Sequence, residues 1–190
     1  MDKRDTQRVM LCFGKLLDYP GPQLAEQARE GAGWLRQSHA PAAEQLDLFL
    51  AFVERTPLGQ LEEIYTGTFD LNPACYIFAG YMLFGESFKR GKFLVGLQER
   101  YAERGFSSEV ELADHLAVVF KFLATLEPDD VLAGELSNDC LLPVLKKMNA
   151  NFARDDKKIN PYAHVLRAIL HVLERAVQRV PVAALGKEGL

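Results

Sequence analysis

The stretch Glu111-Leu-Ala-Asp-His-Leu-Ala-Val-Val-Phe-Lys-Phe-Leu123 is apolar at most positions, yet it carries an adjacent carboxylate and imidazole at Asp114 and His115. Its apolar spacing predicts a helix packed on several sides, and Ser108 with Glu111 predicts a capping box at its start. Burying two polar side chains costs free energy unless partners satisfy them. We therefore expect Asp114 and His115 to lie in the first turns of this helix and to line a groove or a crevice between helices.

Helical periodicity and helix-ending residues recur along the rest of the chain. Thr56 and Pro57 predict the cap and first residue of one helix, and Gly105 predicts the end of another. The apolar run over residues 74–84 is long enough to predict a buried helix. The expected helices cover approximately residues 9–17, 23–36, 41–53, 57–65, 74–84, 87–104, 111–126, 131–151 with an interruption at Pro143, and 160–179.

These elements predict an all-α fold, a single-domain globule of about eight to nine helices. We assign residues 1–180 to this domain and residues 181–190 to a flexible C-terminal tail. At 190 residues the chain is long enough to bury a substantial core.

Charge and composition narrow the functional classes. The formal net charge is −4, which argues against a nucleic-acid-binding protein, since those usually carry a basic stripe. The three cysteines are far apart in the sequence, a pattern typical of a reducing compartment. No segment approaches the roughly 20 apolar residues that a membrane-spanning helix needs. We therefore expect a cytoplasmic protein that neither inserts into membranes nor binds nucleic acid.

The Asp114–His115 pair has a structural and a functional interpretation. In the structural one, Asp114 favours the helix dipole and Glu111 pairs with His115 at i,i+4. A metal site would need a second histidine at suitable spacing, and a catalytic dyad would need a nucleophile such as that of a GxSxG motif. The sequence has neither, so we predict no catalytic residue, no metal and no cofactor. A small helical hydrolase that uses the pair with a metal or a nucleotide remains an alternative.

Two further segments carry candidate binding residues. Gly85 to Lys92 does not match a phosphate-binding loop, because five residues separate its glycines and Phe93 follows the lysine. Within it, Glu86 and Arg90 are spaced for an i,i+4 ion pair, and Arg90 falls on the apolar side of its helix. Glu86 then serves either to fix the start of the helix or to add an acidic spot to a binding groove.

Tyr65 and Phe69 recur at i,i+4 beside carboxylates, in the segment that ends at Asp70. Plain core packing is the first expectation for such a pair. Exposed on the wall of a groove, the same two rings would seat a peptide, because aromatic side chains anchor interfaces.

The three segments together resemble the redox-enzyme maturation chaperones of the TorD/DmsD superfamily, most closely the NarJ-like branch of nitrate reductase delta subunits. The resemblance covers about Leu61 to Leu126 and rests on three motifs. These are Glu62…Tyr65…Phe69-Asp70, then Gly85-Glu86-Ser87…Arg90-Gly91 with its helix up to Gly105, and Glu111-x-x-Asp114-His115-Leu…Phe122-Leu123-Ala124.

The resemblance implies an all-α chaperone without turnover of its own. Such a protein binds the N-terminal segment of the apo form of a molybdenum oxidoreductase catalytic subunit, with nitrate reductase as the default client. It holds the client until the molybdenum cofactor and iron–sulfur cluster are inserted, with cofactor-delivery proteins as possible further partners. A structural subunit of the mature complex is the other alternative. Carried over to this chain, the peptide-binding residues are Tyr65, Phe69, Glu86, Arg90, Asp114 and His115.

Overall fold

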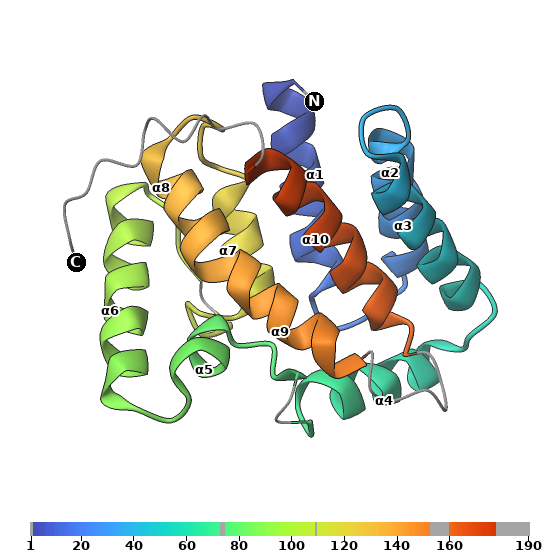
Figure 1. Cartoon of the computed structure of the whole chain (residues 1–190). Coiled ribbons are helices and arrows are strands. Elements are labelled where there is room, and N and C mark those ends of the chain that lie inside the picture. Colours follow the sequence, from blue (N-terminus) through green and yellow to red (C-terminus); the bar gives the residue numbers. More distant parts are fainter. Residues whose placement is uncertain (1, 73–74, 109, 153–159, 178–190) are drawn as a thin grey trace.

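The computed structural model describes residues 2–72, 75–108, 110–152 and 160–177, and within them the regular structure is helical (Figure 1). The elements are α1 (Lys3–Leu16), α2 (Leu24–Leu35), α3 (Ala40–Val53), α4 (Leu58–Phe69), α5 (Ala79–Phe84), α6 (Phe88–Glu103), α7 (Leu116–Leu123), α8 (Val131–Glu135), the π-helix η2 (Leu136–Leu141), α9 (Leu142–Phe152) and α10 (Tyr162–Val177). The predicted all-α fold is confirmed. The predicted tail at 181–190 lies outside the described residues.

The core is formed where α1, α7 and α10 meet the α2–α3 hairpin and α9. Figure 1 shows α2 and α3 on one side of this centre, α5 and α6 on the other, and α4 below it. Tyr162 of α10 packs its ring against Phe49, Tyr65 and Phe69, with centroid separations of 5.4, 5.6 and 5.0 Å. Each fully buried large apolar side chain of this kind contributes about 1.5–3 kcal/mol relative to exposure.

The helix over 74–84 was predicted too long. In the described part of this run the helix covers Ala79–Phe84, and Phe78 forms an isolated antiparallel bridge with His115. The Ala79 N–H donates to the Asp114 carbonyl at 2.7 Å, and the Leu116 N–H donates to the Ile77 carbonyl at 2.9 Å. These long-range bonds satisfy the backbone, so the segment needs no helical bonds there.

The predicted start of the Asp-His helix is also wrong. Helix α7 begins at Leu116, and His115 is its N-cap, with Nδ1 accepting from the Ala117 N–H at 3.2 Å. Ser108 forms no capping box: its hydroxyl donates to the Glu111 carbonyl at 2.6 Å. The residues from 110 to 115 are therefore a non-helical segment, which we call the 110–115 segment, held against α5 by backbone bonds.

Two smaller predictions also differ. Pro57 itself is the N-cap of α4, while the Thr56 hydroxyl donates back to the Phe52 carbonyl at 2.7 Å. The interruption expected at Pro143 is a π-helical stretch, η2, immediately before α9. Proline has no N–H to donate, and its ring crowds the carbonyl four residues earlier, so a widened turn relieves the clash.

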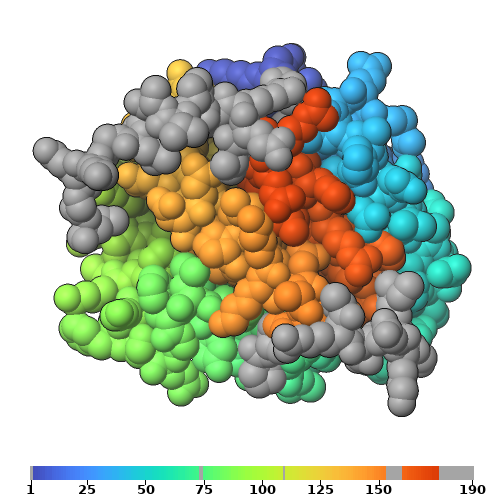
Figure 2. All heavy atoms as spheres, in the orientation of Figure 1, coloured from blue at the N-terminus to red at the C-terminus, as the bar shows by residue number. Residues whose placement is uncertain are grey.

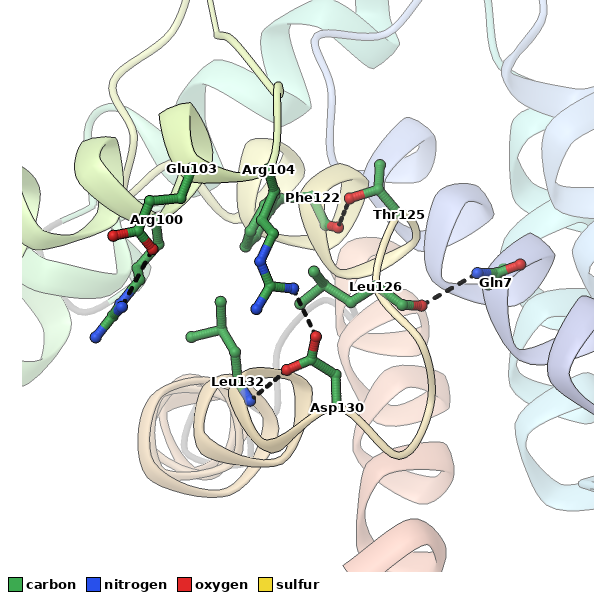
Figure 3. A network of polar contacts seen from close by, with 9 residues as sticks. All are labelled: Gln7, Arg100, Glu103, Arg104, Phe122, Thr125, Leu126, Asp130 and Leu132. Carbon is green, nitrogen blue, oxygen red and sulfur yellow. Dashed lines mark hydrogen bonds and ion pairs between the residues drawn. The ribbon is translucent and has the colours of Figure 1, made fainter.

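A polar network ties α6 to the start of α8 (Figure 3). Arg104 donates to Asp130 at 2.6 Å, and the other Asp130 oxygen accepts from the Leu132 N–H at 2.9 Å. Hydrogen bonds from Arg104 and Leu132 hold the pKa of Asp130 below its usual value. Asp130 therefore caps α8 and fixes the C-terminal end of α6 at the same time.

Candidate functional site

Asp114 lies at the centre of the predicted site. Its side chain is fully buried and accepts from Arg90 Nε at 3.0 Å and from the second guanidinium nitrogen at 3.5 Å. The Arg90 side chain is 21% exposed, so the pair is shielded from solvent mainly on the carboxylate side. Arg90 was expected to be partly buried, and it is. The expected ion-pair partner was wrong: within the described residues Arg90 pairs with Asp114, 24 positions away, and not with Glu86.

Aromatic rings surround the Arg90 guanidinium. Its central carbon lies 5.5 Å from the Phe78 ring centroid and 5.8 Å from that of Tyr81. A guanidinium over ring faces is favoured electrostatically as well as by contact area. Arg90 thus joins α6, α5 and the 110–115 segment in one cluster, and Glu86 lies exposed at the nearby start of α6.

Gly80 on α5 makes room for the ion pair. A Cβ built there would lie 2.7 Å from an Asp114 carboxylate oxygen, 2.9 Å from the Phe93 ring and 3.2 Å from the Arg90 side chain. Contacts under 3.0 Å essentially do not occur at a real Cβ, so a larger residue would displace the carboxylate or the ring. The glycine is needed for close approach, not for backbone conformation.

His115 is buried beside Asp114 and is neutral at physiological pH. Burial, with a smaller effect from Lys121, lowers the pKa of His115 to about 4. Its ring meets the Phe78 ring edge-on at 5.5 Å, and Nδ1 caps α7. A neutral acceptor at Nδ1 is the tautomer that this cap requires, so His115 positions the start of α7.

Tyr65 and Phe69 lie apart from this ion pair, on α4, and both are buried in the core. The Tyr65 hydroxyl donates to the Leu17 carbonyl at 3.0 Å, and its ring packs against Phe69 at 5.0 Å. The ring of Tyr19, which is 58% exposed, covers Tyr65 at 5.5 Å. Tyr19 is thus the exposed member of this aromatic group. It was not predicted as a site residue, although its position directly before Pro20 indicates an exposed turn.

Burial raises the pKa of Tyr65, and the charges of Tyr162, Asp70, Asp18 and Glu111 add smaller contributions in the same direction. Asp18 forms an ion pair with Lys121 at 2.6 Å, while Asp70 and Glu111 are exposed. The 110–115 segment therefore runs from an exposed carboxylate at Glu111 to the buried ion pair at Asp114.

Exposed apolar side chains flank these carboxylates. Leu71 follows Asp70 and is 74% exposed, and Leu112 follows Glu111 and is 51% exposed. We define the acidic–apolar surface as Tyr19, Asp70, Leu71, Glu111 and Leu112. Side chains of this kind accept basic groups by charge-assisted hydrogen bonds and cover apolar ones.

The described residues form neither a metal cluster nor a membrane-spanning helix, and a pocket among them lies away from the predicted site. Among the residues that the structure describes, no three His, Cys, Asp or Glu side chains are grouped to hold a metal ion. In those residues no helix is long and apolar enough to span a membrane. A pocket of about 370 Å³ contains none of the predicted site residues; its lining is His39, Pro41, Ala42, His171, Glu174 and Arg175.

The described residues form an all-α protein in which an Arg90–Asp114 ion pair joins α6 to the 110–115 segment and the acidic–apolar surface is exposed. A solved structure from Archaeoglobus fulgidus, named "Putative Redox Enzyme Maturation Protein", has the same fold: the TM-score is 0.60 at 19% identity, over 92% of this chain and 95% of that one. Residues 35–170 match the nitrate reductase delta subunit family, and the chain belongs to that family.

A relative from Bacillus subtilis (strain 168) is 24% identical over 177 residues, which is 92% of each protein. It is named "Probable nitrate reductase molybdenum cofactor assembly chaperone NarJ". Family membership is the resemblance that the three motifs predicted, and it is confirmed.

Proposed function

We propose that this protein is a NarJ-type chaperone that binds the N-terminal segment of a molybdoenzyme catalytic subunit before the molybdenum cofactor and iron–sulfur cluster are inserted. Membership of the delta subunit family and the name of the Bacillus relative support the class. The observation that carries the binding step is the exposure of the residues of the acidic–apolar surface, of which Tyr19 lies against Tyr65. In this account the protein binds and releases its client, without a catalytic residue or a cofactor of its own.

The occupant suited to this surface is a segment that is basic and apolar. Asp70 and Glu111 are exposed and, within the described residues, have no ion-pair partner, so they can receive arginine or lysine. Leu71 and Leu112 follow them directly in the chain and are exposed, and the exposed Tyr19 ring lies against Tyr65, so all three can cover apolar side chains. The net charge of −4 would also attract a basic segment over a distance.

The six predicted peptide-binding residues take different roles in this proposal. Tyr65 and Phe69 form the buried floor beneath Tyr19. Glu86, exposed at the start of α6, offers a further carboxylate to the client. Arg90, Asp114 and His115 position the 110–115 segment, because the buried Asp114 is linked to α6 through Arg90 and the buried His115 caps α7.

Isothermal titration calorimetry tests the proposal, with a synthetic peptide of the N-terminal segment of the host's molybdoenzyme catalytic subunit. We expect binding that weakens with salt. Reversing the charge of Glu111 or Asp70 with lysine should cost about 1.4 kcal/mol each, a tenfold loss of affinity. Glu44→Lys reverses an exposed carboxylate on α3 and should leave binding unchanged. Absence of binding, or equal losses in all three variants, would contradict the proposal.

A further inference from the structure

Helix α6 presents two faces of different character. Its inner face carries Arg90, Leu97 and Tyr101, which pack toward the body of the protein. The opposite face carries Phe88, Lys92, Val95, Glu99 and Ala102, which fall within about 80° of one another at 100° per residue and are all exposed. Figure 1 shows α6 at the outer edge of the molecule, beside α5. We call this exposed set the outer face of α6.

Two large apolar side chains are exposed on this face. Phe88 is 79% exposed and Val95 is 54% exposed, one above the other at i and i+7. The Lys92 ammonium lies 5.2 Å from the Phe88 ring centroid. A helix face with an apolar stripe of this spacing is the kind that packs against another helix. Figure 2 shows the same edge in yellow-green at the lower left, at the boundary of the molecule.

We propose that the outer face of α6 docks against the same face of a second copy of this chain, as an antiparallel helix pair about a two-fold axis at Val95. A two-fold interface brings each residue opposite the residue equally far from the axis on the other side. Val95 then meets its own copy. Phe88 and Ala102 are both seven residues from Val95, so the large ring of each protomer faces the small side chain of the other.

Charge complementarity selects the antiparallel arrangement. Along the axis, Lys92 lies about 4.5 Å from Val95 on one side and Glu99 about 6 Å on the other, at 1.5 Å per residue. Both lie on the same flank of the stripe, so in the antiparallel pair Lys92 of each protomer lies beside Glu99 of the other. Within the described residues neither side chain has an ion-pair partner in its own chain. In a parallel two-fold pair, Lys92 and Glu99 of one protomer would lie on the opposite flank of the interface from Lys92 and Glu99 of the other, so neither ion pair would form.

The expected dimer is weak. One helix per protomer gives an interface at the small end of the specific range, below about 1,200 Å². We therefore expect a dissociation constant on the order of 10 μM, with the ion pairs weakening as salt rises. This association is independent of client binding, because the acidic–apolar surface shares no residue with the outer face of α6.

Sedimentation velocity of the full chain from about 1 to 300 μM tests the interface. The wild type should pass from monomer to dimer. Val95→Glu, which brings two carboxylates together at the axis, should remain monomeric, and so should Lys92→Glu, which opposes two pairs of glutamates. Lys92→Glu combined with Glu99→Lys restores both ion pairs with exchanged signs and should recover the dimer. Glu44→Lys on α3 is the control and should dimerise like the wild type.

Cross-linking gives an independent readout. The three native cysteines are buried, so Val95→Cys supplies a thiol at the axis that can reach its own copy. Mild oxidation should give a disulfide-linked dimer, and Glu44→Cys should not. A wild type that stays monomeric up to 300 μM, or a dimer that Val95→Glu leaves intact, would overturn the proposal. A monomer whose affinity for the client peptide falls with Val95→Glu would assign the face to the client instead and would equally overturn it.

Discussion

Replacing Arg90 with methionine should destabilise the protein more than replacing Asp114 with asparagine. Arg90→Met leaves a fully buried carboxylate, and Arg90 is the one side chain among the described residues that bonds to it. Breaking a buried ion pair from one side costs about 3–5 kcal/mol. In Asp114→Asn the arginine is already 21% exposed and can rehydrate, and the amide oxygen can still accept from Nε. We expect about 4 kcal/mol for the first variant and about 2 kcal/mol for the second.

These values predict shifts that thermal melts can resolve. At about 2–4 °C per kcal/mol for a chain of this size, Arg90→Met should lower Tm by about 8–16 °C and Asp114→Asn by about 4–8 °C. The double variant should lose less than the sum of the two, with a coupling energy of about 2–3 kcal/mol, because no charge is then left buried without a partner. Chemical unfolding in urea gives the free energies for the cycle.

Lys89→Met is the matched control. Lys89 is next to Arg90 on α6 but exposed, so the same loss of positive charge should change stability by less than about 0.5 kcal/mol. If Arg90→Met costs under about 1 kcal/mol, or if the two single losses add within about 0.5 kcal/mol, the ion pair does not hold the 110–115 segment as argued.

Three further predictions concern the same region. The pKa of His115 is about 4 in the folded protein against an ordinary 6.5, so the unfolded chain takes up a proton first as the pH falls. The free energy of unfolding should therefore decrease by up to about 3 kcal/mol between about pH 6.5 and pH 4. Urea titrations of His115→Gln should lack this pH dependence. Gly80→Ala should cost about 1–3 kcal/mol in the same assay because its methyl group meets the Asp114 carboxylate, whereas Gly91→Ala, in open space on α6, should not destabilise. Arg104 lowers the pKa of Asp130 in the folded protein, so the ionised carboxylate stabilises the fold above the ordinary pKa of aspartate. This stabilisation is lost as the pH falls through the lowered pKa. Asp130→Asn should therefore have a lower Tm than wild type at neutral pH, and the difference should shrink in acid.

Helices were predictable where local residues decide them. Gly105 at positive φ ends α6 as predicted, and Pro41 stands in the first turn of α3. These signals act within one or two turns, so the sequence alone contains them. The all-α fold followed from such local signals repeated along the chain.

The candidate site was harder to predict because hydrogen bonds to backbone far away in the sequence set its conformation. Periodicity extended the Asp-His helix backward through Asp114, whereas the bonds to Ile77 and Ala79 hold that segment extended. The local i,i+4 rule pairs Arg90 with Glu86. In the structure the guanidinium pairs with Asp114, 24 residues away, because a buried carboxylate without a partner costs more free energy than an exposed one. Tyr65 and Phe69 form the aromatic pair that their spacing predicts. The contact of Tyr19 with Tyr65 could not be predicted from the segment around Tyr65, because Tyr19 lies in a distant turn.

Hydrogen–deuterium exchange of the full chain, with and without the client's N-terminal peptide, would locate the peptide on the protein. We expect slower exchange on peptide binding around Tyr19, around Leu71 and along the 110–115 segment, with α2 and α3 unchanged. Protection confined to α2 and α3, or no protection at peptide concentrations that saturate the calorimetric signal, would contradict the proposed binding surface.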